Sequence, residues 1–87
     1  MASSEIRFKR SVSRDLRSLP QKDVHRILER ISALKEDPRP LGSEKLSGRE
    51  WYRIRQGNYR ILYEVDDHQV TVVVVKVGHR REVYRKR

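Results

Sequence analysis

The stretch WYRIRQGNYRILYEVDDHQVTVVVVKVG, residues 51–78, decides the fold because most of its apolar residues recur at every second position. Such alternation is typical of a strand with one buried face, and the run of valines at 72–75 is typical of a strand that is covered. Turn-forming residues at 56–58 and 66–68 divide the stretch into three strands. We therefore predict two successive hairpins, an antiparallel meander in which the valine-rich strand is central.

Two helices are predicted ahead of these strands. Residues 11–19 have apolar side chains at helical spacing, and Pro20 ends that run and can begin the next helix. From 21 to 36 the spacing i, i+3, i+4, i+7 and i+10 predicts a helix of about four turns. A short strand is predicted over 5–9, and the segment 37–48 is a loop rich in proline and glycine.

Together these elements predict an α+β fold in a single domain, residues 1–87. An N-terminal helical hairpin is expected to pack on one face of a small, twisted antiparallel sheet, with the other face exposed to solvent. Only 36% of the 87 residues are hydrophobic, so the core must be compact and a stabilising partner is expected.

The charge is the most informative part of the composition. The chain has 21 Lys and Arg against 12 Asp and Glu, a net charge of +9, and arginine dominates the basic residues from 49 onward. The planar guanidinium matches phosphate oxygens and stacks on bases, whereas lysine is a point charge. This pattern indicates a nucleic acid or a strongly acidic protein as partner; the alternative is a charge that only maintains solubility.

The composition also argues against several classes of protein. A chain without cysteine has no disulfide and no thiolate metal site. The three histidines are scattered in the sequence, so we expect no zinc site, no metal and no other cofactor. The N-terminus lacks an apolar signal region and no stretch has the length of a membrane span, which predicts a cytoplasmic protein without a membrane partner.

Basic residues are predicted to gather on the exposed face of the sheet. Because side chains alternate along a strand, Arg53 and Arg55 share the face opposite Tyr52 and Ile54. Arg60, in the next strand, also alternates with apolar residues. If those apolar residues pack under the helices, all three arginines lie on the open face.

The chain end, KVGHRREVYRKR (76–87), is expected to extend this basic surface. The exit of the valine strand can bring His79, Arg80, Arg81 and Tyr84 to its rim. Guanidinium groups beside an imidazole and an aromatic ring are suited to bind a phosphodiester and its bases.

Each residue also has an ordinary structural explanation. Arginine is common on exposed strands, His79 alone is typical of a solvated turn, and Tyr84 alone is typical of a ring packed over a sheet edge. Arg26 and Arg30 are expected on a solvated helix face. Convergence on one face is what favours an anion-binding surface.

The order of several short motifs resembles a known family. The segment LSGREWYRIRQGNYRILYEVDDHQVTVVVVKVGHRREVY, residues 46–84, is similar to the RelE branch of the RelE/ParE toxin superfamily. The matching features are Leu-Ser-Gly before a Tyr-basic-Ile-basic strand, a Gly-x-Tyr-Arg hairpin, and a terminal Val-Gly-His-Arg followed by Val-Tyr.

The resemblance implies a RelE-like microbial RNase fold and a toxin of a type II toxin–antitoxin pair. Such toxins are ribosome-dependent endoribonucleases that cleave mRNA in the decoding site without a metal, by attack of the 2′-hydroxyl on the adjacent phosphate. The implied partners are the ribosome, mRNA and a cognate acidic RelB-like antitoxin, with DNA bound only indirectly through that antitoxin.

Site residues follow from the resemblance position by position. Arg53 and Arg55 match two basic residues that hold RNA, and Arg60 matches the arginine that stabilises the transition state. Arg80 matches the terminal arginine that acts as acid or charge stabiliser, and Tyr84 matches the tyrosine that stacks on a base.

Two departures from the family pattern bear on mechanism. Arg55 stands where the family has a lysine that is favoured as the base, and an arginine stays protonated at physiological pH. The base is then His79, or else no strong base exists and ribosomal RNA assists positioning. Because only three residues follow Tyr84, inhibition is expected to work by direct covering of the arginine face rather than by displacement of a C-terminal helix.

Two other functions stay open from the sequence. One is a non-enzymatic ParE-like toxin that poisons DNA gyrase, whose relatives generally lack the Arg/His/Tyr cluster at the chain end. The other is an inactive nucleic-acid-binding module of the same fold.

Overall fold

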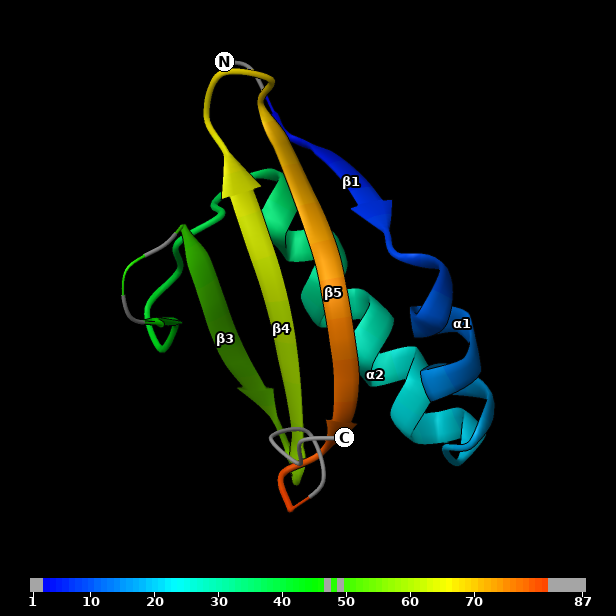
Figure 1. The fold of residues 1–87 in the computed structure, drawn as a ribbon. Helices are drawn as coiled ribbons and strands as arrows, with labels where there is room; N and C mark the ends of the chain where they lie inside the picture. The colour runs from blue at the N-terminus through cyan, green and yellow to red at the C-terminus, as the bar shows by residue number, and fades with distance from the viewer. Residues whose placement is uncertain (1–2, 47, 49, 82–87) are drawn as a thin grey trace.

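The structure, a computed structural model, describes residues 3–46, 48 and 50–81. Figure 1 shows a twisted sheet with α2 behind it and α1 beside the lower part of β5. The elements, in chain order, are β1 (Glu5–Phe8), α1 (Arg10–Arg17), α2 (Gln21–Ser32), a 3₁₀ turn η1 (Ala33–Lys35), β2 (Glu44–Lys45), β3 (Trp51–Gln56), β4 (Tyr59–Asp66) and β5 (Thr71–His79). No helix in these described ranges is both long and apolar enough to span a membrane.

The sheet has five strands in the order β1-β5-β4-β3-β2. The pairs β3–β4 and β4–β5 are antiparallel, which confirms the two predicted hairpins. The valine-rich strand β5, predicted to be central, has a neighbour on each side but is second from the edge, and β4 lies at the middle of the sheet.

The predicted N-terminal helical hairpin and purely antiparallel sheet are wrong. The described chain starts with β1, which pairs with β5 in parallel and makes the sheet mixed. Parallel pairing requires a long crossover between the two strands, and here the helices and the β3–β4 hairpin provide it. The short period-two signal at 5–9 indicated a strand, but a pattern of that length contains no information about its direction or its partner.

The core lies between the helices and one face of the sheet. Ile27, Ile31 and Leu34 in α2 and η1 are no more than 1% exposed. They pack against the alternating apolar residues of the sheet, which confirms the predicted alternation. The buried cluster consists of Val12, Ile27, Ile31, Leu34, Tyr52, Ile54, Ile61, Tyr63, Val65, Val72, Val74 and Val77.

A bulge in β5 keeps this core face continuous. Leu62 pairs with Lys76, but the next residue, Tyr63, pairs with Val74, so Val75 is an extra residue in the ladder. Val74 and Val77 are three positions apart and would face opposite sides of a regular strand. The bulge reverses the alternation between them, and both are buried.

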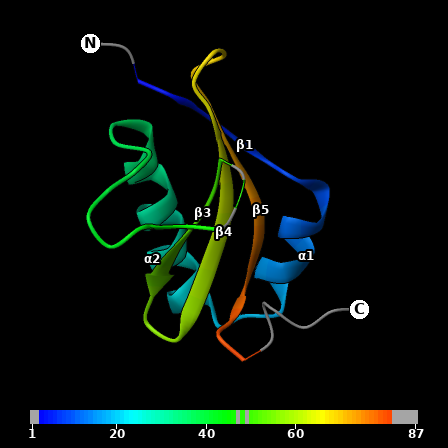
Figure 2. The same ribbon diagram turned by 60° about the vertical axis from the view of Figure 1, so that its left-hand side comes forward.

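Asp15 attaches α1 to β5 just after the bulge. Beyond Phe8 β1 no longer pairs with β5, and α1 lies beside β5 instead, as the turned view in Figure 2 also shows. The amide of Val77 donates a hydrogen bond to Asp15 Oδ2 over 3.1 Å, and Lys76 Nζ lies 3.6 Å from Oδ1. The carboxylate therefore satisfies a backbone donor that no strand reaches.

Arg39 fixes the loop between α2 and β2 to the far end of the sheet. Its Nε donates to the Tyr52 hydroxyl over 2.7 Å, and its Nη2 lies 2.8 Å from Glu50 and 2.9 Å from Asp67. Hydrogen bonds to Asp67, Tyr52 and Glu50 raise the pKa of Arg39. Hydrogen bonds from Arg39, Lys45 and Tyr52 lower the pKa of Glu50 to about 2.

Asp15→Ala should lower the free energy of unfolding by about 1–3 kcal/mol, because it leaves the buried Val77 amide without an acceptor. Asp15→Asn retains an acceptor oxygen and should cost less. Urea denaturation measures both variants, with Glu36→Ala on the exposed surface as control. A loss for Asp15→Ala no larger than that of the control would contradict the role assigned to this carboxylate.

The hydrogen bonds and ion pairs that join Arg39 to Tyr52, Glu50 and Asp67 form the Arg39 network. This network should make the free energy of unfolding decrease at acid pH. Because the folded pKa of Glu50, about 2, lies below its ordinary value of 4.5, its stabilising effect is complete above pH 4.5 and is lost as the pH falls towards 2. Urea midpoints measured over this range should decline more steeply for the wild type than for Glu50→Gln. Parallel curves for the two proteins would show that Glu50 has no such role.

Candidate functional site

Three arginines lie together on the open face of the sheet. Arg55 and Arg60 are directly opposite each other in the β3–β4 ladder, and Arg53 stands two residues before Arg55, opposite Leu62. All three are on the face away from the buried Ile54 and its neighbours. The structure therefore brings the three predicted residues together.

This arrangement places like charges against each other. Directly opposed cations on neighbouring strands repel, because their side chains are close. Within the described residues no acidic side chain pairs with Arg55 or Arg60, whereas Arg53 donates from Nε to Glu44 over 2.6 Å. A positive pair without a counter-ion is an arrangement that a bound anion would stabilise.

A hollow of about 270 Å³ opens beside these arginines at the edge of β3. It exists because the short β2 pairs only with Tyr52 and Arg53 and leaves the rest of that edge uncovered. Its lining residues are Arg30, Gly42, Glu44, Arg53, Ile54, Arg55 and Arg60.

Arg30 is the member of this site that sequence reasoning missed. It was expected on a solvated helix face, but it is only partly exposed and its Nε is buried. The signal was its spacing: Arg30 is three residues after Ile27 and four before Leu34, at the border of the buried stripe of α2. A cation at such a position can bury its stem and direct its head around the sheet edge.

The end of β5 brings one predicted residue close to the arginines. Gly78 pairs with Arg60, so no side chain covers the open face there. The amide of Arg80 donates to the carbonyl of Asn58 over 2.8 Å, which holds Arg80 beside the β3–β4 turn with its side chain exposed. Arg80 therefore lies at the rim of the surface that carries Arg60.

His79 lies on the other side of the sheet. It pairs with Tyr59, and the two rings meet edge to face with centroids 6.1 Å apart. The Tyr59 hydroxyl donates to Asp23 in α2, and this hydrogen bond raises the pKa of Tyr59. The amide of Arg81 donates to His79 Nδ1 over 3.2 Å. The imidazole is thus directed towards the helices and away from the arginines, and the predicted Tyr84 lies outside the described residues.

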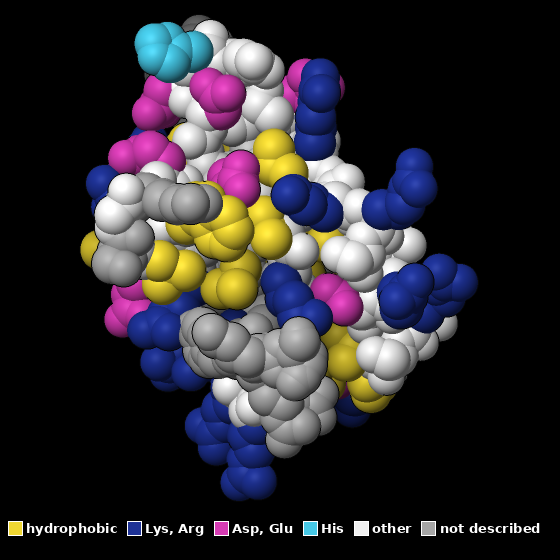
Figure 3. All heavy atoms as spheres, viewed as in Figure 1, with side chains coloured by type: hydrophobic (Ala, Val, Ile, Leu, Met, Phe, Trp, Pro, Cys, Tyr) yellow, Lys and Arg dark blue, Asp and Glu magenta, His cyan; other side chains and the backbone are white. Residues whose placement is uncertain are grey.

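Figure 3 views the molecule from the side of the open face. Apolar side chains occupy its centre, and Lys and Arg side chains gather around the lower end of the β3–β4 hairpin. The alternation that buries Tyr52 leaves Trp51 half-buried on this side. Apolar and aromatic surface beside guanidinium groups is the combination that single-stranded nucleic acids require.

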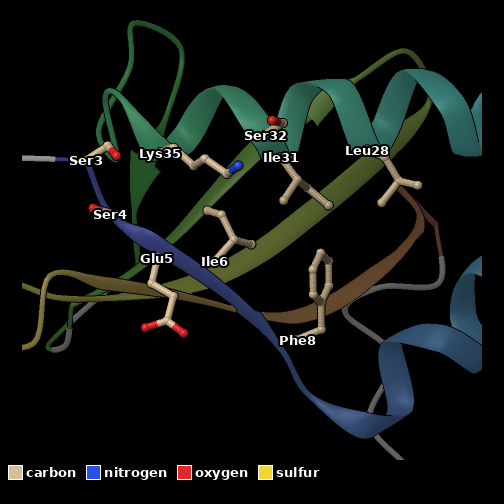
Figure 4. Close-up of a pocket in the computed structure, with 9 residues that line it drawn as sticks. All are labelled: Ser3, Ser4, Glu5, Ile6, Phe8, Leu28, Ile31, Ser32 and Lys35. Atoms are coloured by element: carbon tan, nitrogen blue, oxygen red, sulfur yellow. The ribbon is translucent and has the colours of Figure 1, made fainter.

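A second hollow, mainly apolar, lies on the opposite side of the molecule. It runs between β1 and α2, with a volume of about 550 Å³, and Figure 4 shows Ile6, Phe8, Leu28 and Ile31 directed into it. Phe8 is 47% and Leu28 40% exposed. Apolar side chains of this size left open to water are typical of a protein-binding groove rather than a phosphate site.

Comparison with known proteins identifies the family of this chain. The family described as "ParE toxin of type II toxin-antitoxin system, parDE" matches residues 6–84. Toxin RelG of Mycobacterium tuberculosis is 34% identical over 85 residues, which cover 93% of this chain and 95% of that protein.

Solved structures show the same fold. The archaeal RelE–RelB complex from Pyrococcus horikoshii superimposes with a TM-score of 0.82 at 28% identity, covering 92% of this chain and 98% of the other. The toxin–antitoxin complex RelBE2 from Mycobacterium tuberculosis gives a TM-score of 0.79 at 30% identity, covering 88% and 98%. The chain belongs to the RelE/ParE superfamily and is a RelE-type toxin of a toxin–antitoxin system.

Arg60→Gln should stabilise the free protein, by up to about 1 kcal/mol, because it removes the repulsion between opposed cations on β3 and β4. The gain should shrink at high salt, where the repulsion is screened. Urea denaturation at low and high salt measures it, with Arg26→Gln on the exposed surface of α2 as a control of equal charge. A destabilised Arg60→Gln at low salt would mean that Arg60 has a structural partner.

Proposed function

We propose that this toxin is a ribosome-dependent endoribonuclease that cleaves mRNA in the decoding site and so inhibits translation in the cytoplasm. The observation that carries the proposal is the pair Arg55–Arg60, opposed across two strands with no acidic partner among the described residues. Family membership supports a toxin function, because the relatives include toxin RelG and a RelE protein in complex with RelB.

The reaction that fits this surface is an intramolecular transesterification of the RNA phosphodiester. The 2′-oxygen of a ribose attacks the adjacent phosphorus, the bond to the 5′-oxygen breaks, and a 2′,3′-cyclic phosphate and a 5′-hydroxyl result. A base takes the proton of the 2′-hydroxyl and an acid supplies one to the leaving oxygen. Negative charge grows on the phosphoryl oxygens in the transition state, so cations fixed around them lower the barrier.

Each arginine has a separate role in this proposal. Arg60, in the middle of the sheet and opposite Gly78, contacts the scissile phosphate and stabilises the transition state. Arg80 at the rim contacts the same phosphate from the side of the leaving oxygen. Arg53, Arg55 and Arg81 bind the RNA backbone, and Tyr84 stacks on a base.

The remaining part of the mechanism is the base that takes the proton of the 2′-hydroxyl. Arg55 stays protonated and serves as a clamp. The Nδ1 atom of His79 accepts a hydrogen bond from the Arg81 amide, so a neutral imidazole carries its hydrogen on Nε2. Neither ring nitrogen then has a free lone pair that could accept a proton from the 2′-hydroxyl. His79 can act as base only after it turns towards the open face; without that turn, charge stabilisation by the arginines provides most of the rate.

An acidic antitoxin is the second proposed partner. The two solved relatives above are complexes with antitoxins, one of them RelB. On this chain the apolar groove of Figure 4 and the cations that border it suit an amphipathic acidic segment, with salt-sensitive association. Those cations are Lys9, Arg10 and Lys35. Further acidic residues of the same segment would cover the arginines, and DNA would be bound only through the antitoxin.

Arg60→Ala and Arg80→Ala should each reduce cleavage of mRNA on programmed ribosomes by at least about 100-fold, as expected when a group that stabilises transition-state charge is removed. Primer extension on a defined mRNA measures the cuts, with and without ribosomes. The matched control is Arg26→Ala, an arginine of the exposed surface of α2, which should cleave like the wild type.

Two outcomes would contradict the proposal. Wild-type protein that leaves mRNA intact on ribosomes but blocks supercoiling by DNA gyrase would be a toxin of the ParE type. Unchanged cleavage by both variants would keep the activity but remove Arg60 and Arg80 from the site.

A further inference from the structure

Arg30 is a half-buried arginine whose Nε lacks a hydrogen-bond partner among the described residues. This Nε is shut off from solvent. The other end of the guanidinium lies under Gly42, where a Cβ added to that glycine would be 3.8 Å from Arg30 Nη2. A guanidinium in such a place normally finds an acceptor, because burial of an unpaired polar group is unfavourable.

The surroundings of Arg30 are strongly positive. Four arginines from two different layers of the fold line one hollow of about 270 Å³: Arg30 from α2 and Arg53, Arg55 and Arg60 from the sheet. The only acidic residue in the described lining is Glu44, and its carboxylate is held by Arg53. Charges of one sign in a concave site attract a ligand of the other sign.

Gly42 keeps this hollow open. Its φ of 96° lies in the left-handed region that favours glycine, and the loop turns there without placing a side chain over Arg30. The hollow is therefore a cationic site at the edge of β3 that adjoins the open face and shares its arginines.

We propose that this hollow is a second phosphate subsite, which binds the RNA backbone phosphate next to the scissile one, with Arg30 as its main contact. The subsite rests on the proposed endoribonuclease function, since it extends the same RNA strand. Arg60 lines the hollow and also belongs to the open face, so a strand whose scissile phosphate lies at Arg60 reaches Arg30 with its neighbouring phosphate. Phosphate oxygens in the hollow then accept hydrogen bonds from the planar fork of Arg30.

Binding of two oligonucleotides tests the subsite without any cleavage. A dinucleotide with one phosphate and a trinucleotide with two, each with 2′-deoxyribose at the attacking position, are titrated into the intact protein. The trinucleotide should bind wild type and Arg26→Met more tightly than the dinucleotide does. Arg30→Met should lose about tenfold in trinucleotide affinity, the effect of one charge-assisted hydrogen bond, and little in dinucleotide affinity. For Arg30→Met, the slope of log affinity against log salt concentration should be smaller in magnitude by about 0.7, because one phosphate contact is lost.

Stability distinguishes a binding residue from a structural one. Because Arg30 Nε is buried and has no partner within residues 3–46, 48 and 50–81, Arg30→Met should melt at the same or a higher temperature than the wild type. Arg30→Gln is measured in parallel. If both variants unfold, or if both melt lower while trinucleotide affinity is unchanged, Arg30 is structural and the proposal is overturned.

Two further results would also overturn it. Equal affinity of the wild type for the two oligonucleotides would mean that no second phosphate is bound. A penta-glutamate peptide that loses affinity for Arg30→Met, beside unchanged trinucleotide binding, would assign the hollow to carboxylates of a protein partner. Primer extension on ribosomes is independent of these titrations, so failure of the endoribonuclease proposal and failure of the subsite remain separate results.

Discussion

The bulge at Val75 is the constraint on which the arrangement of this protein depends. It allows Val74 and Val77 to face the same core, and from that point it sets which residues of β5 face the opposite side. Gly78 comes to lie across from Arg60, and the chain leaves the strand so that Arg80 meets Asn58 at the β3–β4 turn. Without the extra residue, every side chain after Val75 would face the other way.

The same register separates two groups that are neighbours in sequence. Arg80 lies at the rim of the arginine face, while His79 packs against Tyr59 on the side of the helices. Their separation has a chemical consequence, because it places the imidazole away from the arginine surface in this conformation. The site that remains is built from permanent cations, and it suits stabilisation of charge better than proton transfer.

The arginine surface also lowers the stability of the free protein. Two features are unfavourable in the free protein: the opposed cations on β3 and β4, and the buried Nε of Arg30, which has no partner in the described part of the chain. The compact core under α2, the Asp15 hydrogen bond to β5 and the Arg39 network at the other end of the sheet offset these terms. Residues that destabilise a free protein in this way are expected where a ligand of opposite charge completes the structure.

Sequence alone determined the hairpins, the α2 stripe and the face of Arg53, Arg55 and Arg60, because strand and helix periods assign side chains to faces locally. It also sufficed for the superfamily, because the motifs lie in a fixed order along the chain. It did not determine the parallel pairing of β1 with β5, the bulge, or the placement of Arg30 beside the sheet arginines. Those features depend on contacts between segments far apart in the chain, and only tertiary packing decides which distant segments meet.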